Sequence, residues 1–539
     1  METKTCQNCK TNFIVESEDF EFYEKIKVPA PTWCTDCRMM RRMVWRNERN
    51  LYKRTCGLCD KPIITIYSPD KPFTVYCQPC YRSASWDPMS CGIDYDPSRS
   101  FLEQFRELQI RVPRLYAFVF QNTNSDYTNG SAFNKNCYLL FVSDHNEDSQ
   151  YSHFIMHCRD CIDLLDCYEC ERCYESVSCK KCYQVLYSKD CVNSQNLWFS
   201  KNCSNSHDCF GCVNLRNAQY QIYNEQYDKD AYFKKLREFR LDTPEGIKTA
   251  KATAHEFWLQ FPVKYMAGLK NIDVTGESVS NSKNTKESYN SELLEDCKFI
   301  NYGNGAKSCY DGHVVVDGCE FSYEIVSAIA LQNCKSCFCT WHAFECEYCD
   351  TCENSNNLFG CISLQKKQYC ILNKQYTKEE YHKLREKIVS EMRSREEYGE
   401  FFPLNLSPFA YNETAAQENF PLDKETTEKS GLLWKQPEAR DYKIGGDIHG
   451  CSNNGTVIGC TVAFKMTPQE LEFYRQINLP MPDICPNCRH SERLKLKNPL
   501  RLWHRKCMKD GCENEFETSY SPDRPEIVYC EQCYQQEVV

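Results

Sequence analysis

The sequence predicts a mainly β protein in which a long repetitive body lies between two copies of a small, cysteine-stapled unit. Two observations lead to this fold class. The stretch YSPDKPFTVYCQPCY near the start recurs near the end as YSPDRPEIVYCEQCY, and cysteines in the middle recur at a fixed spacing. With 539 residues the chain is long enough for several structural units.

Cysteine usage and charge limit the classes of function. The chain holds 40 cysteines, and its N-terminus, METKTCQNCK, has the polar character of a protein without a secretory signal. We find no apolar run near the roughly 18 residues of a membrane span. We therefore expect a cytoplasmic protein with reduced thiols, in which CxxC pairs are metal ligands. The net charge of −10 argues against a chain that coats nucleic acid along its whole length, but it allows a local basic patch.

The cysteines near both ends follow the same spacing. They are Cys6, Cys9, Cys34, Cys37, Cys56, Cys59, Cys77 and Cys80 at the start, and Cys460, Cys485, Cys488, Cys507, Cys512, Cys530 and Cys533 at the end. The interval from Cys9 to Cys34 equals that from Cys460 to Cys485, and the next two intervals between knuckles also agree. Chance does not reproduce three intervals and their contents, so the sequence contains an internal duplication.

Each set of four cysteines predicts a zinc ribbon. A CxxC knuckle presents two sulfurs to one ion, and a second knuckle after a hairpin completes the tetrahedron. Four thiolates around Zn²⁺ at about 2.3 Å supply on the order of 10 kcal/mol, which a chain too short to bury a core needs for folding. We therefore expect about four zinc ions in the protein.

One of the four sites departs from this spacing. The position that corresponds to Cys6 is Val457, and the upstream stretch is DIHGCSNNGTVIGC. We expect Cys451 to supply the fourth ligand through a longer loop, with His449 as the alternative. A third possibility is a site of three sulfurs with an open position, which is the arrangement of catalytic zinc.

The N-terminal stretch CQNCKTNF…FEFYEKIKVPAPTWCTDCRMMRR resembles the probable zinc-ribbon domain of many bacterial proteins. TCGLCDKPI…YSPDKPFTVYCQPCY resembles a second short ribbon that is often found beside it. The ribbons cover about 150 of the 539 residues. The resemblance implies zinc and a binding role, in a family without a settled activity.

Basic segments lie between the knuckles of both terminal units. RMMRRMVWRNERNLYKRT and RHSERLKLKNPLRLWHRK each hold seven Arg or Lys residues and one acid, with interleaved aromatic residues. Such segments are typical of phosphate contacts with stacking bases, so RNA or a nucleoprotein assembly is the leading candidate partner. The candidate contact residues are Arg38, Arg42, Arg46, Arg54, Arg489, Arg493, Lys497 and Arg505. Alternatively, these residues pair with nearby acids, solvate the ribbons or bind a protein.

The middle of the chain predicts a duplicated, right-handed parallel β-helix-like solenoid with short helical inserts. Cys137, Cys158 and Cys179 are evenly spaced, and two further cysteine series share their period. We therefore expect stacked coils of about 21 residues, one for each period of the cysteines. CFGCVNLRNAQYQIYNEQY is paralleled by LFGCISLQKKQYCILNKQY, which indicates two solenoid halves.

We assign the following units. They are ribbon 1 with its basic segment (1–54), ribbon 2 (55–90), a connecting segment (91–132), the first solenoid half (133–227), a helical and polar spacer (228–290), the second half (291–376), a helix and linker (377–445), ribbon 3 with its basic segment (446–506) and ribbon 4 (507–539). Terminal modules of the same kind can pair, so a homo-oligomer is possible.

The solenoid cysteines have several possible roles. A small thiol packs well in a narrow coil, and free cysteine is among the most buried residue types. Alternatively, Cys158, Cys161, Cys179 and Cys182 converge on a further metal ion, or the thiols form disulfides. The overall hypothesis is a non-enzymatic zinc-binding scaffold or adaptor. Its rivals are a carbohydrate-active or zinc-dependent enzyme on a β-helix and a thiol-rich metal or redox buffer; Asp144, Glu147 and Asp148 near His145 do not by themselves make a catalytic pair.

Overall fold

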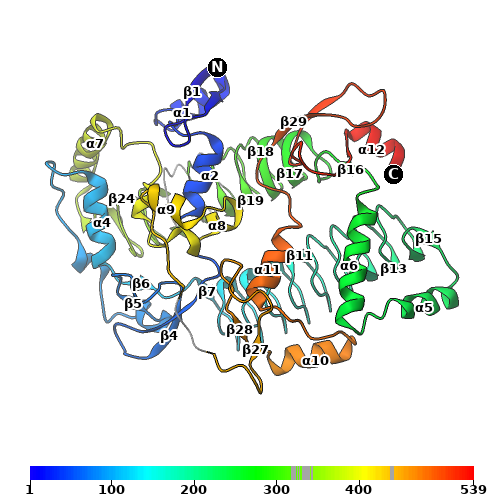
Figure 1. Cartoon of the computed structure of the whole chain (residues 1–539). Coiled ribbons are helices and arrows are strands. Elements are labelled where there is room, and N and C mark those ends of the chain that lie inside the picture. The colour runs from blue at the N-terminus through cyan, green and yellow to red at the C-terminus, as the bar shows by residue number, and fades with distance from the viewer. Residues whose placement is uncertain are drawn as a thin grey trace.

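The computed structural model describes residues 1–316, 318, 323, 324, 326, 328, 329, 340, 341, 344–437 and 442–538. It is a β-solenoid of about 19 turns with few helices, and groups of four cysteines lie near both termini. This confirms the predicted fold class (Figure 1). Part of the second solenoid half, predicted at 291–376, lies outside the described residues.

The coils of the solenoid are shorter than the cysteine spacing predicts. Phe141 pairs in parallel with His153, and His153 pairs with Leu165, so corresponding positions in successive coils differ by 12. In the described part of the chain the interval departs from 12 at two places: it is one residue longer between Val315 and Ala328 and one residue shorter between Ile272 and Lys283. The predicted coil length is therefore wrong, and Cys137 and Cys158 do not stack on one another.

A period of three residues runs within each coil. The φ angles of Asn136, Leu139 and His145 are 56°, 52° and 56°, and positive φ recurs at nearly every third position of the described coils. This left-handed conformation costs roughly 1–2 kcal/mol at a residue other than glycine. Hydrogen bonds between coils offset the cost: the N–H of His145 donates to Ala132 O at 3.1 Å.

The residue after each left-handed position faces the solenoid interior. Along one stretch these interior residues are Cys137, Leu140, Ser143, Asn146, Ser149, Ser152, Ile155, Cys158, Cys161, Leu164, Cys167 and Cys170, all of them buried. Several of their N–H groups also point inward and need an acceptor: Cys161 N donates to Ser149 Oγ at 3.2 Å, and Leu164 N donates to Ser152 Oγ at 2.9 Å. Small side chains with an acceptor atom meet both demands, which accounts for the abundance of interior Cys, Ser and Asn.

Interior cysteines and serines are therefore expected to be interchangeable. Cys167 Sγ accepts from Cys179 N at 3.4 Å, as Ser176 Oγ accepts from Ser188 N at 3.4 Å. We expect Cys167→Ser to change the unfolding free energy by less than about 1 kcal/mol. Cys167→Val has a similar volume but leaves the buried N–H of Cys179 unpaired, which costs about 1–3 kcal/mol. Thermal unfolding of both variants checks this; equal melting temperatures would contradict it.

The first solenoid half contains one short antiparallel strand at its end and parallel strands before it. The parallel strands are β7 (Val119–Phe120), β8 (Asn129–Ala132), β9 (Phe141–Asp144), β10 (His153–Met156), β11 (Leu165–Tyr168), β12 (Gln195–Trp198), β13 (His207–Phe210) and β14 (Gln219–Ile222), and the antiparallel strand is β15 (Glu225–Gln226).

The second half repeats this arrangement. Its strands are β17 (Ile272–Ser280), β18 (Lys283–Glu292), β19 (Asn301–Asn304), β20 (His313–Val316), β21 (Ala328–Ile329), β22 (Thr340–Trp341), β23 (Phe344–Glu347), β24 (Asn356–Phe359), β25 (Gln368–Ile371) and the antiparallel β26 (Lys374–Gln375). It begins before the predicted position 291, because the stretch predicted as a polar spacer forms β17 and β18. Thr285 and Ser288 occupy interior positions there and are fully buried, so a polar sequence still builds the coil.

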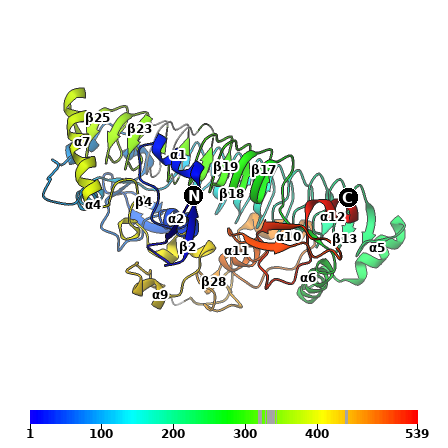
Figure 2. The same cartoon turned by 90° about the horizontal axis from the view of Figure 1, so that it is seen from above.

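The two halves lie side by side and run in opposite directions (Figures 1 and 2). The rings of Phe154 and Tyr302 stack across them with centroids 3.6 Å apart. Tyr302 follows Phe154 by 148 positions, and Asp311 follows Asp163 by the same interval within the similar stretches CIDL and CYDG. Corresponding residues contact each other only near a two-fold axis, so an approximate two-fold axis passes between these two rings.

We name the four cysteine-bearing units modules 1 to 4, with the boundaries assigned above for ribbons 1 to 4. Modules 1 and 2 contain β1 (Glu2–Thr5), β2 (Asn12–Val15), α1 (Ser17–Lys25), α2 (Thr35–Met43), β3 (Tyr52–Thr55), β4 (Pro62–Thr65), β5 (Val75–Tyr76) and α3 (Gln78–Tyr81). Modules 3 and 4 contain β27 (His449–Gly450), β28 (Ala463–Phe464), α10 (Pro468–Gln476), α11 (Pro486–Leu494), β29 (Trp503–Lys506), β30 (Glu515–Thr518), β31 (Val528–Tyr529) and α12 (Glu531–Val538).

The modules dock on the two halves in a crossed arrangement. Helix α2 of module 1 contacts β20 of the second half, and α11 of module 3 contacts β11 of the first half. In module 2, β5 pairs with β6 (Arg114–Leu115), just before the first half begins. In module 4, β31 pairs with β16 (Val263–Lys264), just before the second half begins. Each end of the chain therefore contacts both solenoid halves.

The remaining elements cap and brace the solenoid. They are η1 (Pro88–Cys91), α4 (Phe101–Arg111), α5 (Lys229–Glu238), α6 (Pro244–Trp258), α7 (Lys378–Ser394), η2 (Leu404–Leu406), η3 (Tyr411–Glu413), α8 (Ala415–Asn419) and α9 (Lys424–Lys429). The segment predicted as a linker is packed: Phe402 lies 4.9 Å from Trp45, and Phe409 stacks on Tyr67 at 5.5 Å between ring centroids. Over the described part of the chain, no helix combines the length and apolar character that crossing a membrane requires.

Candidate metal centres

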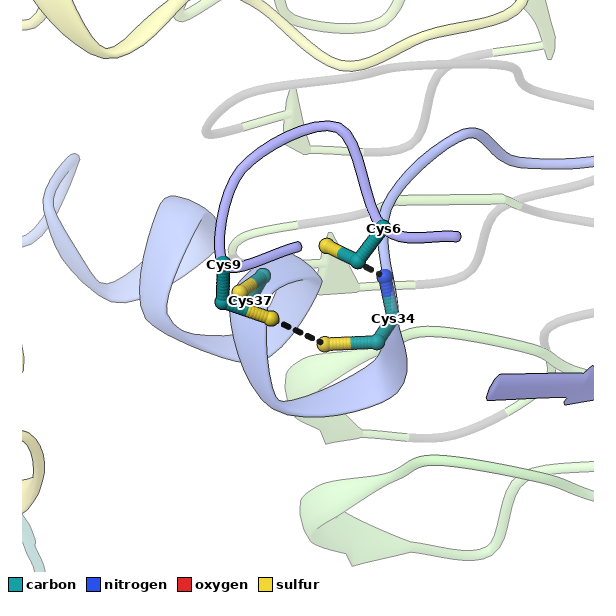
Figure 3. A group of neighbouring side chains, drawn as sticks. All are labelled: Cys6, Cys9, Cys34 and Cys37. Carbon is teal, nitrogen blue, oxygen red and sulfur yellow. Dashed lines mark hydrogen bonds between the residues drawn. The ribbon is translucent and has the colours of Figure 1, made fainter. Parts of the chain in front are cut away.

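Four groups of four cysteines come together, one in each module. They are Cys6, Cys9, Cys34 and Cys37; Cys56, Cys59, Cys77 and Cys80; Cys451, Cys460, Cys485 and Cys488; and Cys507, Cys512, Cys530 and Cys533. Within each group the sulfur atoms all lie within 4.8 Å of one another. Figure 3 shows the first group, with the four side chains drawn together from the hairpin loop and the start of α2.

Local structure places the sulfurs in the same way in each module. A hairpin carries the first pair, and the second pair begins a helix: Cys34, Cys77 and Cys485 are the N-cap residues of α2, α3 and α11. The partial positive charge at a helix N-terminus favours thiolate.

One backbone hydrogen bond recurs in all four groups, from the N–H of the third cysteine to the sulfur of the first. The four bonds are Cys34 N to Cys6 Sγ (3.2 Å), Cys77 N to Cys56 Sγ (3.3 Å), Cys485 N to Cys451 Sγ (3.3 Å) and Cys530 N to Cys507 Sγ (3.3 Å). The protein therefore fixes the orientation of the first sulfur independently of any ion.

The sulfur–sulfur distances fit a tetrahedral ion. Bonds of about 2.3 Å, the length that zinc forms with thiolate, place tetrahedral sulfurs about 3.8 Å apart. The separations are 3.7 Å for Cys9–Cys34, 3.8 Å for Cys59–Cys77 and 3.9 Å for Cys512–Cys530. Among the described residues, every cysteine is a free thiol. Each group could therefore hold a metal ion.

Thiolate character is already favoured in the first group. Hydrogen bonding with Cys37 is the main cause that lowers the pKa of Cys34 to about 5, against the opposing effect of burial. The pKa of Cys37 is raised in turn, chiefly by the same hydrogen bond. One thiolate at neutral pH gives an incoming cation an initial ligand.

Module 3 has its fourth sulfur at the position that the sequence predicted. Cys451 Sγ lies 3.6 Å from Cys460 Sγ and 3.8 Å from Cys488 Sγ. His449 does not belong to this group. The group offers four sulfurs, as the other three do, so it lacks the open position that a catalytic zinc needs.

The predicted further group of Cys158, Cys161, Cys179 and Cys182 is not brought together within the described chain. These thiols line the interior at successive levels and donate to carbonyl oxygens: Cys158 Sγ lies 3.5 Å from Met156 O, and Cys182 Sγ lies 3.4 Å from Cys191 O. The prediction assumed that Cys158 and Cys179 lie one coil apart, and the shorter coil of the structure removes its basis.

The predicted nucleic-acid contacts have mostly intramolecular partners. Arg38, Arg42, Arg489 and Arg493 are at most 2% exposed. Arg38 Nε and Arg42 Nη1 lie 2.9 and 2.8 Å from the same oxygen of Asp311. Correspondingly, Arg489 Nε and Arg493 Nη1 both lie 3.0 Å from carboxylate oxygens of Asp163.

The other four basic residues are partly exposed. Arg46 pairs with Glu48 at 2.7 Å, and Lys497 Nζ donates to Asp166 and Tyr302. Arg54 of module 1 donates to Phe73 O of module 2, and Arg505 of module 3 donates to Tyr520 O of module 4. Helix α2, which carries Arg38 and Arg42, ends at Met43, before Arg46. RNA binding stays a prediction, and the four buried guanidinium groups anchor modules 1 and 3 to the solenoid.

Sequence reasoning missed Asp163 as an anchor, although CIDL and CYDG occupy corresponding positions in the two halves. It also missed a group formed by His153, Glu418 and His490, whose ligand atoms lie within 4.8 Å of one another. These three residues share no spacing, because they come from β10, α8 and α11. Only the folded chain brings them together.

Comparison with known proteins gives no relative for this arrangement. No protein-family model, no curated protein and no solved structure matches the chain. Function is therefore inferred from the geometry of the sites.

Proposed function

We propose that this protein is a non-enzymatic zinc-binding scaffold or adaptor, with one Zn²⁺ in each of its four modules. The observation that carries the proposal is the set of four cysteine groups with tetrahedral sulfur spacing and a shared backbone hydrogen bond. Four sulfur ligands in a tetrahedron are typical of zinc or of an iron–sulfur centre. The spacing equals that expected for a single ion with bonds of about 2.3 Å, which favours zinc over a cluster of several irons.

The ions would act structurally. Each module is too small to bury a core of its own, and each docks on the solenoid through side chains that its metal-bearing knuckle orients. Arg38 and Arg489 directly follow Cys37 and Cys488, so a fixed knuckle aims each guanidinium at its buried carboxylate. Metal binding thus helps the modules at both ends of the chain to stay docked on the solenoid.

Metal analysis tests the proposal. We expect at least four zinc equivalents per purified chain, measured by mass spectrometry of the elements. Cys9→Ser, Cys59→Ser, Cys460→Ser and Cys512→Ser should each remove one equivalent, because each breaks one group of four. Cys167→Ser is the matched control and should keep all of them, since this thiol lies in the solenoid interior.

Two results would contradict the zinc scaffold. One is fewer than three zinc equivalents in wild-type protein, and the other is iron in place of zinc. A thiol-rich metal buffer would instead take up many labile ions and lose several when an interior thiol is replaced.

The partner is proposed to be RNA or a nucleoprotein assembly, as the basic segments suggest. Because Arg38, Arg42, Arg489 and Arg493 are buried, their substitution would report on docking rather than on phosphate contact. The fluorescence anisotropy of labelled RNA, titrated with intact protein at several salt concentrations, is the appropriate test. Affinity that falls steeply with salt supports the proposal. Absence of binding at low salt removes it.

A further inference from the structure

A group of two buried imidazoles and one partly exposed carboxylate lies beside the two-fold axis. His153 comes from β10 of the first solenoid half, Glu418 from α8 and His490 from α11 of module 3. Their ligand atoms all lie within 4.8 Å of one another, and both imidazole side chains are about 3% exposed. His490 Nε2 and Glu418 Oε1 are 3.2 Å apart, close enough to bind one ion together.

A buried nitrogen of this group, Nδ1 of His153, has no hydrogen-bond partner. The opposite nitrogen of His153, Nε2, lies 2.8 Å from Glu48 Oε2. A carboxylate that holds one imidazole nitrogen while the other is left for a metal is the usual arrangement behind metal-bound histidine. A buried polar atom without a partner costs free energy, and an ion would supply that partner.

A cavity adjoins the group. It has a volume of about 190 Å³, and its lining includes Glu48, His153, His313 and Glu418. Two imidazoles and one carboxylate leave coordination positions for water or a small ligand, as in catalytic rather than structural zinc sites. Such a space is large enough for several water molecules.

The approximate two-fold symmetry is broken at these histidines. The position that corresponds to His490 is Met39, and the position that corresponds to His153 is Asn301. The docking arginines, by contrast, are present in both copies: Arg38 corresponds to Arg489. Docking therefore does not require histidine at either position, and the two imidazoles need another explanation.

We infer that His153, Glu418 and His490 bind a fifth divalent metal ion, Zn²⁺, at a site with open coordination toward the adjoining cavity. Arg49 Nε lies 3.7 Å from Glu418 Oε1, so the ion shares this carboxylate with a guanidinium. The fifth ion is therefore held more weakly than the sulfur-bound ions and is the first to leave in a competing chelator.

The test compares the zinc content of matched variants after saturation with ZnCl₂ and gel filtration. The informative substitutions are His490→Met and His153→Asn, because the other half of the molecule holds these residues at the corresponding positions. Glu418→Gln is a third. We expect five equivalents in wild type and in the exposed control His145→Asn, and four in each of the three variants. Equal zinc content in wild type and all three variants overturns the inference.

A second measurement does not depend on folding of the variants. In crystals of the wild-type protein, anomalous diffraction at the zinc absorption edge should show a peak between His153 and His490. Peaks at the four cysteine groups, with no peak between His153 and His490, would overturn the inference and leave the scaffold proposal intact. Absence of the four sulfur-site peaks would instead contradict the scaffold proposal.

Discussion

Replacing Asp311 by asparagine is expected to lower the unfolding free energy by about 3–5 kcal/mol, the usual cost of breaking a buried ion pair. One oxygen of this carboxylate faces both Arg38 Nε and Arg42 Nη1, at 2.9 and 2.8 Å. All three side chains are at most 2% exposed. Burial already lowers the pKa of Arg42, and Asp311 opposes that effect. Without the carboxylate two cations would remain in a desolvated interface.

The corresponding change Asp163→Asn is expected to cost less. Arg489 keeps Glu470 at 3.0 Å, and Arg493 keeps Glu175 at 2.8 Å. Differential scanning calorimetry of the two variants measures the difference. Asp296→Asn is the matched control, because Asp296 also has positive φ (53°) but is exposed. Asparagine tolerates this backbone conformation, so the control isolates the charge.

Hydrogen exchange would show where the effect acts. We expect Asp311→Asn to accelerate amide exchange in α2 of module 1 and to leave α11 of module 3 protected, because α2 contacts β20 while α11 contacts β11. An Asp311→Asn protein with wild-type stability would show that these guanidinium groups do not anchor module 1. RNA binding by Arg38 would then deserve a direct test.

The metal groups could be predicted from the sequence because the spacing of their ligands is set locally, within each knuckle. A CxxC knuckle has a fixed spacing, and the duplication supplied each group twice. Cys451 was predictable since Val457 cannot bind a metal and the nearest upstream thiol is Cys451. The fold class was predictable for a similar reason. The repeats of a solenoid are visible in the sequence even when the contacts between residues are unknown.

The coil length was not predictable from cysteines alone. Cys137, Cys158 and Cys179 share the interior position of a three-residue repeat, and their spacing is a multiple of three but not of the coil length. Several residue types fill the interior positions, so Cys, Ser and Leu occur there without the period of the coil. The start of the second half was missed for the same reason, because Thr285 and Ser288 fill the interior where cysteine was expected.

Contacts between segments far apart in the chain could not be predicted from the sequence. Arg38 was predicted to contact nucleic acid because its segment is rich in basic residues, yet its partner Asp311 follows it by 273 residues. Burial of a charged side chain depends on a carboxylate that the fold brings to it. The same holds for the group of His153, Glu418 and His490, which lies where two halves and a terminal module meet.

Replacing Cys485 by alanine is expected to unfold module 3 while the solenoid stays folded. Structural zinc contributes on the order of 10 kcal/mol to a small metal-dependent domain, which exceeds what its own core supplies. Cys485 is also the N-cap of α11, so the change loses both a ligand and the start of the helix that carries Arg489 and Arg493. Trypsin should then cleave within 446–506 at low protease concentration.

Cys191→Ala provides the matched control for this change. Its thiol is buried in the solenoid and belongs to none of the metal groups found in the described chain. The control therefore shows the effect of losing a buried thiol that is not a metal ligand. We expect no new cleavage in 446–506 for this variant. Resistance of Cys485→Ala to trypsin, with zinc content unchanged, would show that module 3 is held by packing on β11 instead of by metal. Cleavage that extends into 119–226 would show that the first solenoid half itself depends on the docked module. Unfolding of α11 would separate Arg493 from the buried carboxylates of Asp163 and Glu175.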